Sequence, residues 1–223
     1  MSTYNTYFNA EARYGQHIPV WLGVVSPIPV GGVLAESECV AGNFLPAGTP
    51  MELKAGVASP LKGFVVKSTS TAGSNTIITV KPLFPGESPK TSDFLQKVGA
   101  TFAATGKAWN PDAVAVNSSD AEAFDITIAT ANIDSVAAGD VLAYSSATAE
   151  GSSKSLKVQP NYYLYNDVAI PSDGPGITIS NIQASVALVN FHGEGILVNR
   201  TPAAAVKAQM KAACPNVIQE DRF

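Results

Sequence analysis

Apolar residues along this chain come in short runs that are separated by glycine, proline and small polar residues. In the segment FDITIAT (residues 124–130), Phe124, Ile126 and Ile128 alternate with polar residues, which places the three side chains on one face of an extended strand. Similar strand-like windows lie at residues 20–25, 63–69, 75–83, 155–160, 162–170 and 184–191. The pattern therefore predicts a mainly β protein.

The segment FLPAGTPMEL (residues 44–53) has the pattern of a strand, a tight turn and a second strand, and it predicts a hairpin. Gly48 supplies the positive φ that such a turn needs. A related pattern occurs in VAAGDVLAY (136–144), and a weaker one in VGGVLAE (30–36). These echoes indicate either an internal duplication of a β unit or the common chemistry of tight turns.

The clearest helix is expected in RTPAAAVKAQMKAACP (residues 200–215). Thr201 is suited to the N-cap, Pro202 to the first helical position, and Pro215 ends the helix. The apolar stripe of this helix consists of Ala203, Val206, Met210 and Ala213. A second, short helix is expected at residues 91–99.

The first seventeen residues lack a firm period and are predicted to form an extended N-terminal arm. The arm carries four aromatic residues, which either bind a partner or pack on their own domain: Tyr4, Tyr7, Phe8 and Tyr14. The predicted fold is a small β-barrel or β-sandwich-like domain with an inserted or second β subdomain. Its expected parts are the arm (1–17), a first β unit (18–85), an Ala-rich insertion or second β unit (86–160), closing strands (161–200), and a C-terminal helix and tail (201–223).

Charged residues make up 14% of the chain, against roughly 25% in an ordinary soluble domain. A surface of Ser, Thr, Asn and Gly does little to keep copies of a chain apart, which suits a subunit of an assembly. The net charge of -4 and the scattered lysines and arginines argue against direct binding of nucleic acid. We find no secretory signal and no run of ~18 apolar residues, so we expect synthesis in the cytoplasm and no membrane span.

Residues for catalysis are scarce. His192 lies in NFHGEGILV, a sequence that lacks the nucleophile elbow of hydrolases, and His17 is the other histidine. Cys39 and Cys214 are isolated, so two thiols in the core are favoured over a disulfide or a metal site. We therefore predict no enzymatic activity, no cofactor and no metal, with a small hydrolase using His192 as the minor alternative.

Two further patterns bear on binding chemistry. Gly106 and Lys107 end a segment whose glycine spacing does not match a phosphate loop, so a turn is expected there. Acidic residues gather at Glu36 with Glu38, and in the segment 120–125 at Asp120, Glu122 and Asp125. Both groups are interpreted as solvated faces, because nothing indicates a facing partner that would raise a pKa.

Several segments resemble proteins of phage heads. FLPAGTPMEL, followed by GFVVKST (63–69) and TIITVKPL (76–83), resembles the start of lambda-type head decoration proteins. The segment ASVALVNFHGEGILVNR (184–200) looks like their final strand pair. The segment NRTPAAAVKAQMKAACPNV (199–217) is similar to the C-termini of head fiber proteins of tailed phages. The segment YGQHIPVWLGVV (14–25) resembles the opening of the same head fiber proteins. The matches cover about half of the chain.

The resemblance implies a structural virion protein on the outside of the capsid, often a homotrimer, whose partner is the major capsid protein. It would either clamp neighbouring capsid subunits or project as a fiber, and the N-terminal arm would bind the shell. Residues 85–160 depart from the shorter decoration domain, so one elaborated domain and two domains both remain open.

The alternative function is a receptor- or carbohydrate-binding module of a phage tail or fiber. The segment NYYLYND (161–167) carries it, because strand alternation places Tyr163 and Tyr165 on one face and Tyr162 and Leu164 on the other. An exposed Tyr163 and Tyr165 would bind sugars. The competing interpretation is that one of the two faces packs into the core.

Overall fold

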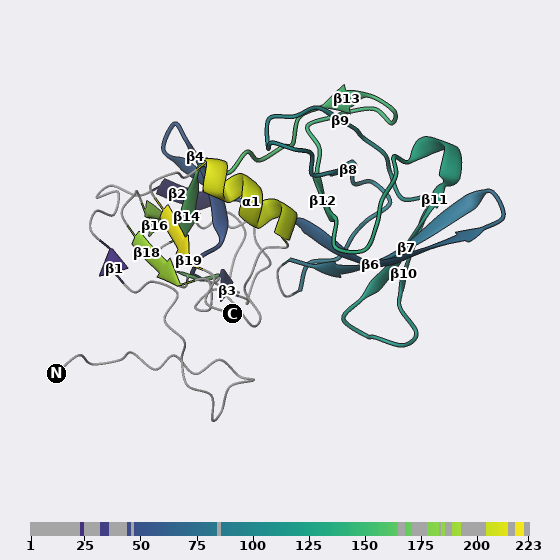
Figure 1. Cartoon of the computed structure of the whole chain (residues 1–223), viewed down its shortest axis with the longest axis horizontal. Helices are drawn as coiled ribbons and strands as arrows, with labels where there is room; N and C mark the ends of the chain where they lie inside the picture. The colour runs from purple at the N-terminus through teal and green to yellow at the C-terminus, as the bar shows by residue number, and fades with distance from the viewer. Residues whose placement is uncertain are drawn as a thin grey trace.

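The computed structural model describes residues 23–24, 32–35, 44–45, 47–83, 86–164, 168–170, 178–182, 184–185, 189–192, 204–213 and 217–220. The expected fold class is confirmed: 45% of the chain is strand and about 8% is helical, with several antiparallel sheets and one short C-terminal helix, α1 (Ala204–Ala213). Most of the strands form two groups, which Figure 1 shows side by side.

The first group, here called the middle lobe, is formed by residues 63–158. Its main sheet has six strands in the order β10-β11-β7-β6-β12-β8, and every neighbouring pair is antiparallel. The six strands are β6 (Gly63–Ala72), β7 (Asn75–Pro82), β8 (Leu95–Lys97), β10 (Ala113–Val116), β11 (Phe124–Ala129) and β12 (Val141–Tyr144). Beside this sheet lie the pair β9 (Gly106–Lys107) and β13 (Ser153–Lys154), and the 3-10 turn η2 (Thr130–Asn132).

The second group, here called the terminal lobe, combines strands from before and after the middle lobe. Its main sheet has the order β16-β2-β5-β4-β14-β17. These strands are β2 (Gly32–Ala35), β4 (Pro50–Lys54), β5 (Val57–Pro60), β14 (Tyr162–Leu164), β16 (Thr178–Ile182) and β17 (Ala184–Ser185). Two small sheets complete it: β1 (Gly23–Val24) with β18 (Val189–His192) and β19 (Val217–Glu220), and β3 (Phe44–Leu45) with β15 (Val168–Ala169).

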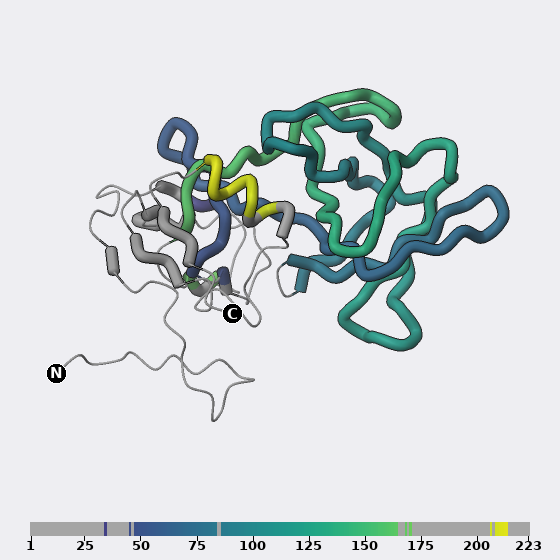
Figure 2. Tube along the Cα trace, viewed as in Figure 1, coloured from purple at the N-terminus to yellow at the C-terminus, as the bar shows by residue number. Residues whose placement is uncertain are grey.

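The middle lobe is inserted between β5 and β14 of the terminal lobe (Figure 2). The boundary expected at residue 85 falls between β7 and β8, which belong to the same six-stranded sheet. The structure therefore places the division between β5 and β6 instead. The reason is that the hairpin β6–β7 buries its apolar face against later strands, and no local pattern shows which strands those are.

The hairpin expected at residues 44–53 is only half correct. The turn is present, with Gly48 at φ 81°. The strands on its two sides do not pair with each other, however: β3 pairs with β15, and β4 lies between β5 and β14. The hairpin that forms is β4–β5, closed by Ala55 and Gly56 at φ 51° and 80°.

The turn at Gly139 has the same hydrogen bonds as the turn at Gly48. The N–H of Gly48 donates to the carbonyl of Leu164 at 2.8 Å, and the N–H of Gly139 donates to the carbonyl of Val66 at 2.9 Å. In return, the N–H of Leu164 donates to the carbonyl of Thr49, and the N–H of Val66 donates to the carbonyl of Asp140, both at 2.9 Å. The neighbouring strands arrive from different positions in the chain, which favours shared turn chemistry over a duplicated domain.

The helix expected at residues 91–99 is wrong. The segment begins with a turn in which the N–H of Asp93 donates to the carbonyl of Lys90 at 3.0 Å, and it continues as strand β8. Pairing with β12 on one side and a bridge from Leu95 to Trp109 on the other decide this outcome. Tertiary pairing therefore overrides the local cap and stop signals.

Helix α1 lies where the two lobes meet (Figure 1). Val206 and Met210 of the expected apolar stripe are fully buried, whereas Ala213 is exposed and Ala203 lies outside the described residues. The buried cluster around the two side chains includes Leu61 and Tyr163 near the terminal lobe and residues of the middle lobe, Val98, Phe102, Val141, Ala143 and Leu156. The Gln209 amide also donates to the carbonyl of Gly99. The helix thus contacts both lobes.

Candidate interaction edges of the middle lobe

One edge of the six-stranded sheet is the short strand β10. It pairs with β11 on one side, and among the described residues no strand lies on its other side. Its sequence is Ala-Val-Ala-Val, without charge or proline, and Val116 is 60% exposed. Free edges of natural sheets usually carry charged residues, proline or a bulge that prevents pairing with another chain. Within its four residues, β10 carries no charge and no proline.

The hydrogen-bond pattern shows which backbone groups of β10 point outward. The N–H of Asn117 donates to the carbonyl of Ala123 at 2.9 Å, so these two residues form a hydrogen-bonded pair. Such pairs alternate along an antiparallel ladder, and the next β10 residue that faces β11 is therefore Ala115. The N–H and C=O groups of Val114 and Val116 face away from β11 and are available to a further strand.

The second feature is the far half of the hairpin β6–β7, here called the ribbon (residues 67–76), which projects from the middle lobe (Figure 1). β12 covers β6 only from Gly63 to Val65, so in the described part of the chain nothing pairs with the outer edge from residue 67 onward. Counting back from the turn at residues 73–74, Thr69 and Thr71 direct their backbone groups to this outer edge. The β6 side of the ribbon is exposed and rich in Ser and Thr.

The opposite edge of the sheet is closed differently. β8 pairs with β12, and its outer side is occupied by Trp109, whose N–H and C=O exchange hydrogen bonds of 2.9 Å with Leu95. Trp109 is buried. The middle lobe thus covers one edge with its own chain and leaves β10 and the ribbon exposed.

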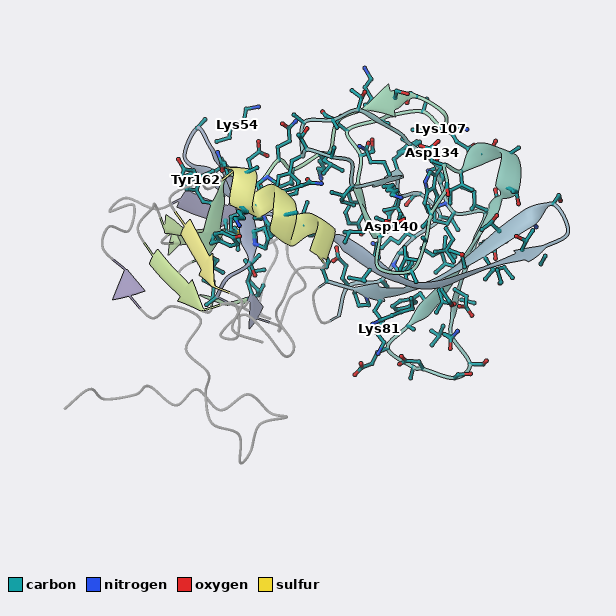
Figure 3. The ribbon with its side chains drawn as sticks, viewed as in Figure 1. Lys54, Lys81, Lys107, Asp134, Asp140 and Tyr162 are labelled. Atoms are coloured by element: carbon teal, nitrogen blue, oxygen red, sulfur yellow. The ribbon has the colours of Figure 1, made fainter. Side chains whose placement is uncertain are left out.

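The loop beside β10 is held by its own polar contacts. The amide of Asn117 donates to both carboxylate oxygens of Asp125 at 2.9 and 3.0 Å, and Thr79 donates to the same carboxylate at 2.7 Å. Lys81, labelled in Figure 3, forms ion pairs with Asp120 at 2.7 Å and with Glu122 at 3.4 Å. The acidic residues predicted as a solvated face therefore fix this loop, and Asp125 of β11 accepts the hydrogen bonds that hold Asn117 at its start.

A buried acid lies near the point where the chain enters the middle lobe. Glu87 is only 9% exposed, and its Oε2 has no hydrogen-bond partner among the described residues. Burial raises the pKa of Glu87 to about 7, while the charge of Lys62 and a hydrogen bond from Tyr144 oppose this rise. Burial also raises the pKa of Tyr144, and Nζ of Lys62 lies 5.7 Å from the centroid of its ring.

This cluster consists of one buried acid with a tyrosine and a lysine beside it. Within the described ranges, no group of three or more His, Cys, Asp or Glu side chains is arranged to hold a metal ion.

Lys107, expected in a turn, lies in β9, where Nζ donates to the carbonyl of Ala131 at 3.3 Å. The described helix is also too short to cross a membrane.

The structure corrects one predicted site residue and leaves others outside its described part. Tyr163 is 1% exposed and belongs to the cluster beneath α1, so it does not contribute to an exposed aromatic face. The backbone of His192 lies in β18, opposite Glu220. Outside the described residues lie Tyr4, Tyr7, Phe8, Tyr14, Tyr165, His17, Cys39 and Cys214.

Sequence reasoning did not identify β10 or Glu87 as notable features. The signal for β10 was present in PDAVAVN (residues 111–117), where small and branched apolar residues alternate without charge. No local signal marks Glu87, because its burial is a property of the folded chain and the groups that act on its charge, Lys62 and Tyr144, come from other parts of the sequence.

Comparisons with protein-family models, with curated proteins and with solved structures found no match. The functional argument therefore depends on the residues and geometry described above.

Proposed function

We propose that this protein is a structural component of a phage particle that binds the outer surface of the capsid, as a head decoration or head fiber protein. Its partner is the major capsid protein, its active form is a homotrimer, and it acts without catalysis. In the virion it reinforces the shell or projects from it.

The observation that carries this proposal is a pair of free strand edges in the middle lobe, the uncharged strand β10 and the Ser- and Thr-rich outer edge of the ribbon. An exposed strand edge binds other proteins by strand addition, in which backbone hydrogen bonds supply affinity and side chains supply specificity. The low charge of the chain reduces repulsion between closely packed subunits. The sequence resemblance to head decoration and head fiber proteins supports this kind of assembly.

Two contacts with the capsid are assigned in this proposal. The N-terminal segment 1–17 anchors the protein through its aromatic residues, Tyr4, Tyr7, Phe8 and Tyr14. The outer edge of the ribbon adds a strand to a capsid sheet through the backbone of Thr69 and Thr71.

The test is co-sedimentation of the purified protein with empty capsids of the phage that encodes it. The full chain is expected to sediment with the capsids, and a variant that lacks residues 1–17 is expected to fold and to remain in the supernatant. If the full chain does not bind, the proposed function is refuted. If the shortened chain binds equally well, the role of residues 1–17 is refuted.

The ribbon is tested in the same assay with Thr71→Pro. Proline removes an N–H that faces outward and leaves the ladder between β6 and β7 intact, because edge positions tolerate proline. The matched control is Thr71→Val, which keeps the N–H and the branched shape of the side chain. We expect weaker capsid binding only for the proline variant, and equal binding of both variants would exclude the ribbon as the contact.

A further inference from the structure

The outer edge of β10 is complementary to itself. Only Val114 and Val116 present outward N–H and C=O groups, so an antiparallel partner with the same sequence has few registers to choose from. When Val114 of one copy lies opposite Val116 of the other, both residues of both copies form hydrogen bonds, which gives four bonds. Registers that place Val114 opposite Val114, or Val116 opposite Val116, form only two bonds between these residues.

The side chains agree with the four-bond register. It places Ala115 opposite Ala115 of the second copy, and two methyl groups fit the close spacing of a non-hydrogen-bonded pair. Val114 and Val116 pair across the edge on the face that carries Ile126, which is buried in the core of the lobe. The contact would therefore cover the exposed Val116 and continue the apolar layer of the sheet from one copy into the next.

The charges around β10 also permit this register. Asp112, the charged residue next to β10 in the chain, lies opposite Ser118 of the second copy, so no like charges face each other across the new pair. Asp125, which pairs with Ala115 inside the sheet, is held by hydrogen bonds from Asn117 and Thr79. The carboxylate of Asp112 is already engaged, because its Oδ2 accepts a hydrogen bond of 2.9 Å from the N–H of Ala129. The ion pairs of Lys81 hold the acidic loop residues 120 and 122.

We propose that β10 pairs antiparallel with β10 of a second copy, about a two-fold axis at Ala115, and joins two six-stranded sheets into one continuous sheet. The proposal goes beyond capsid attachment, since it concerns contacts between copies of this chain. A strand pair of this length makes a weak interface in free solution, and a surface that holds many copies close together raises its occupancy.

The test measures the mass of the purified full chain by sedimentation equilibrium, from about 10 μM to about 1 mM, in the absence of capsids. We expect the average mass to rise with concentration to at least twice that of the smallest species. Ala115→Lys places two lysines opposite each other at the axis and is expected to raise the dissociation constant about tenfold. The matched control, Ala113→Lys, adds the same charge on the same exposed face but opposite Asn117, and is expected to change the constant by less than about twofold.

A charge-swap experiment identifies the partner as a second copy in this register. Ala115→Glu alone is expected to weaken the association as Ala115→Lys does, and an equimolar mixture of the two variants is expected to restore it. The proposal is overturned by a wild-type mass that does not change with concentration, by equal effects of lysine at 113 and 115, or by a mixture that stays dissociated. Because no capsid is present, these outcomes are independent of the capsid-binding test.

Discussion

Replacing Glu87 by glutamine is predicted to stabilise the protein at high pH and to have little effect at low pH. Glu87 is almost fully buried, and burial raises its pKa from the ordinary value of 4.5 to about 7. Below pH 4.5 the side chain is protonated in both the folded and the unfolded state. Between pH 4.5 and 7 the unfolded chain loses its proton first, so the stability of the wild type falls as the pH rises through this window.

The size of the stability difference follows from the shift of the Glu87 pKa. A difference of about 2.5 pKa units, at about 1.4 kcal/mol per unit, corresponds to roughly 3 kcal/mol of lost stability at pH 8. Glutamine has nearly the same shape and carries no charge to bury. The free energy of unfolding of Glu87→Gln is therefore expected to exceed that of the wild type by up to about 3 kcal/mol at pH 8, and to match it within about 0.5 kcal/mol at pH 4.

Urea denaturation of both proteins at pH 4, 6 and 8 measures this difference. With a slope of ~3 kcal/mol per molar urea, the midpoint of the variant should lie about 1 M higher at pH 8. The control is Glu150→Gln, which makes the same substitution at an exposed residue and should shift the midpoint at pH 8 by much less than Glu87→Gln does. A difference between wild type and Glu87→Gln that does not change with pH, or a variant that is less stable at pH 8, would refute the reasoning.

Two further substitutions test the packing of the fold. Gly63→Ala should destabilise the protein by more than about 2 kcal/mol, because a Cβ at this position would lie 2.2 Å from the carbonyl oxygen of Leu142 and would separate β6 from β12; a thermal midpoint equal to that of the wild type would contradict this. Met210→Ala should cost about 2–5 kcal/mol, because the side chain is fully buried between the lobes. The exposed Ala213→Ser serves as its control, and equal urea midpoints for the two variants would show that α1 does not hold the lobes together.

Local features of this fold could be predicted from the sequence because they depend on neighbouring residues. The alternation in residues 124–129 corresponds to β11, with Ile126 and Ile128 buried. The turn glycines at 48 and 139 have the positive φ that their Ala-Gly context predicts. The C-terminal helix was predicted from its proline positions and its apolar stripe, two residues of which are buried.

The candidate site was less predictable, because exposure of an edge is a property of the whole sheet. The alternation in residues 113–116 indicates a strand, but whether a partner covers it depends on the order of strands that are far apart in sequence. Tyr163 illustrates the same limit. Its alternation with Leu164 is visible in the sequence, and both side chains are buried because α1 and a second core cluster cover the two faces of β14.

The sequence by itself determined the mainly β character of this protein, its turn positions, its C-terminal helix and its small number of histidines and cysteines. These depend on periodicity, on glycine and proline geometry, and on composition, all of which act over a few residues or over the chain as a whole. Only the tertiary structure decided that β3 and β4 pair with other strands and not with each other, that residues 95–97 form a strand, and that β10 is left at a free edge. The physical reason is that strand pairing joins residues far apart in the chain, and the burial that selects one pairing exists only once the sheets are assembled.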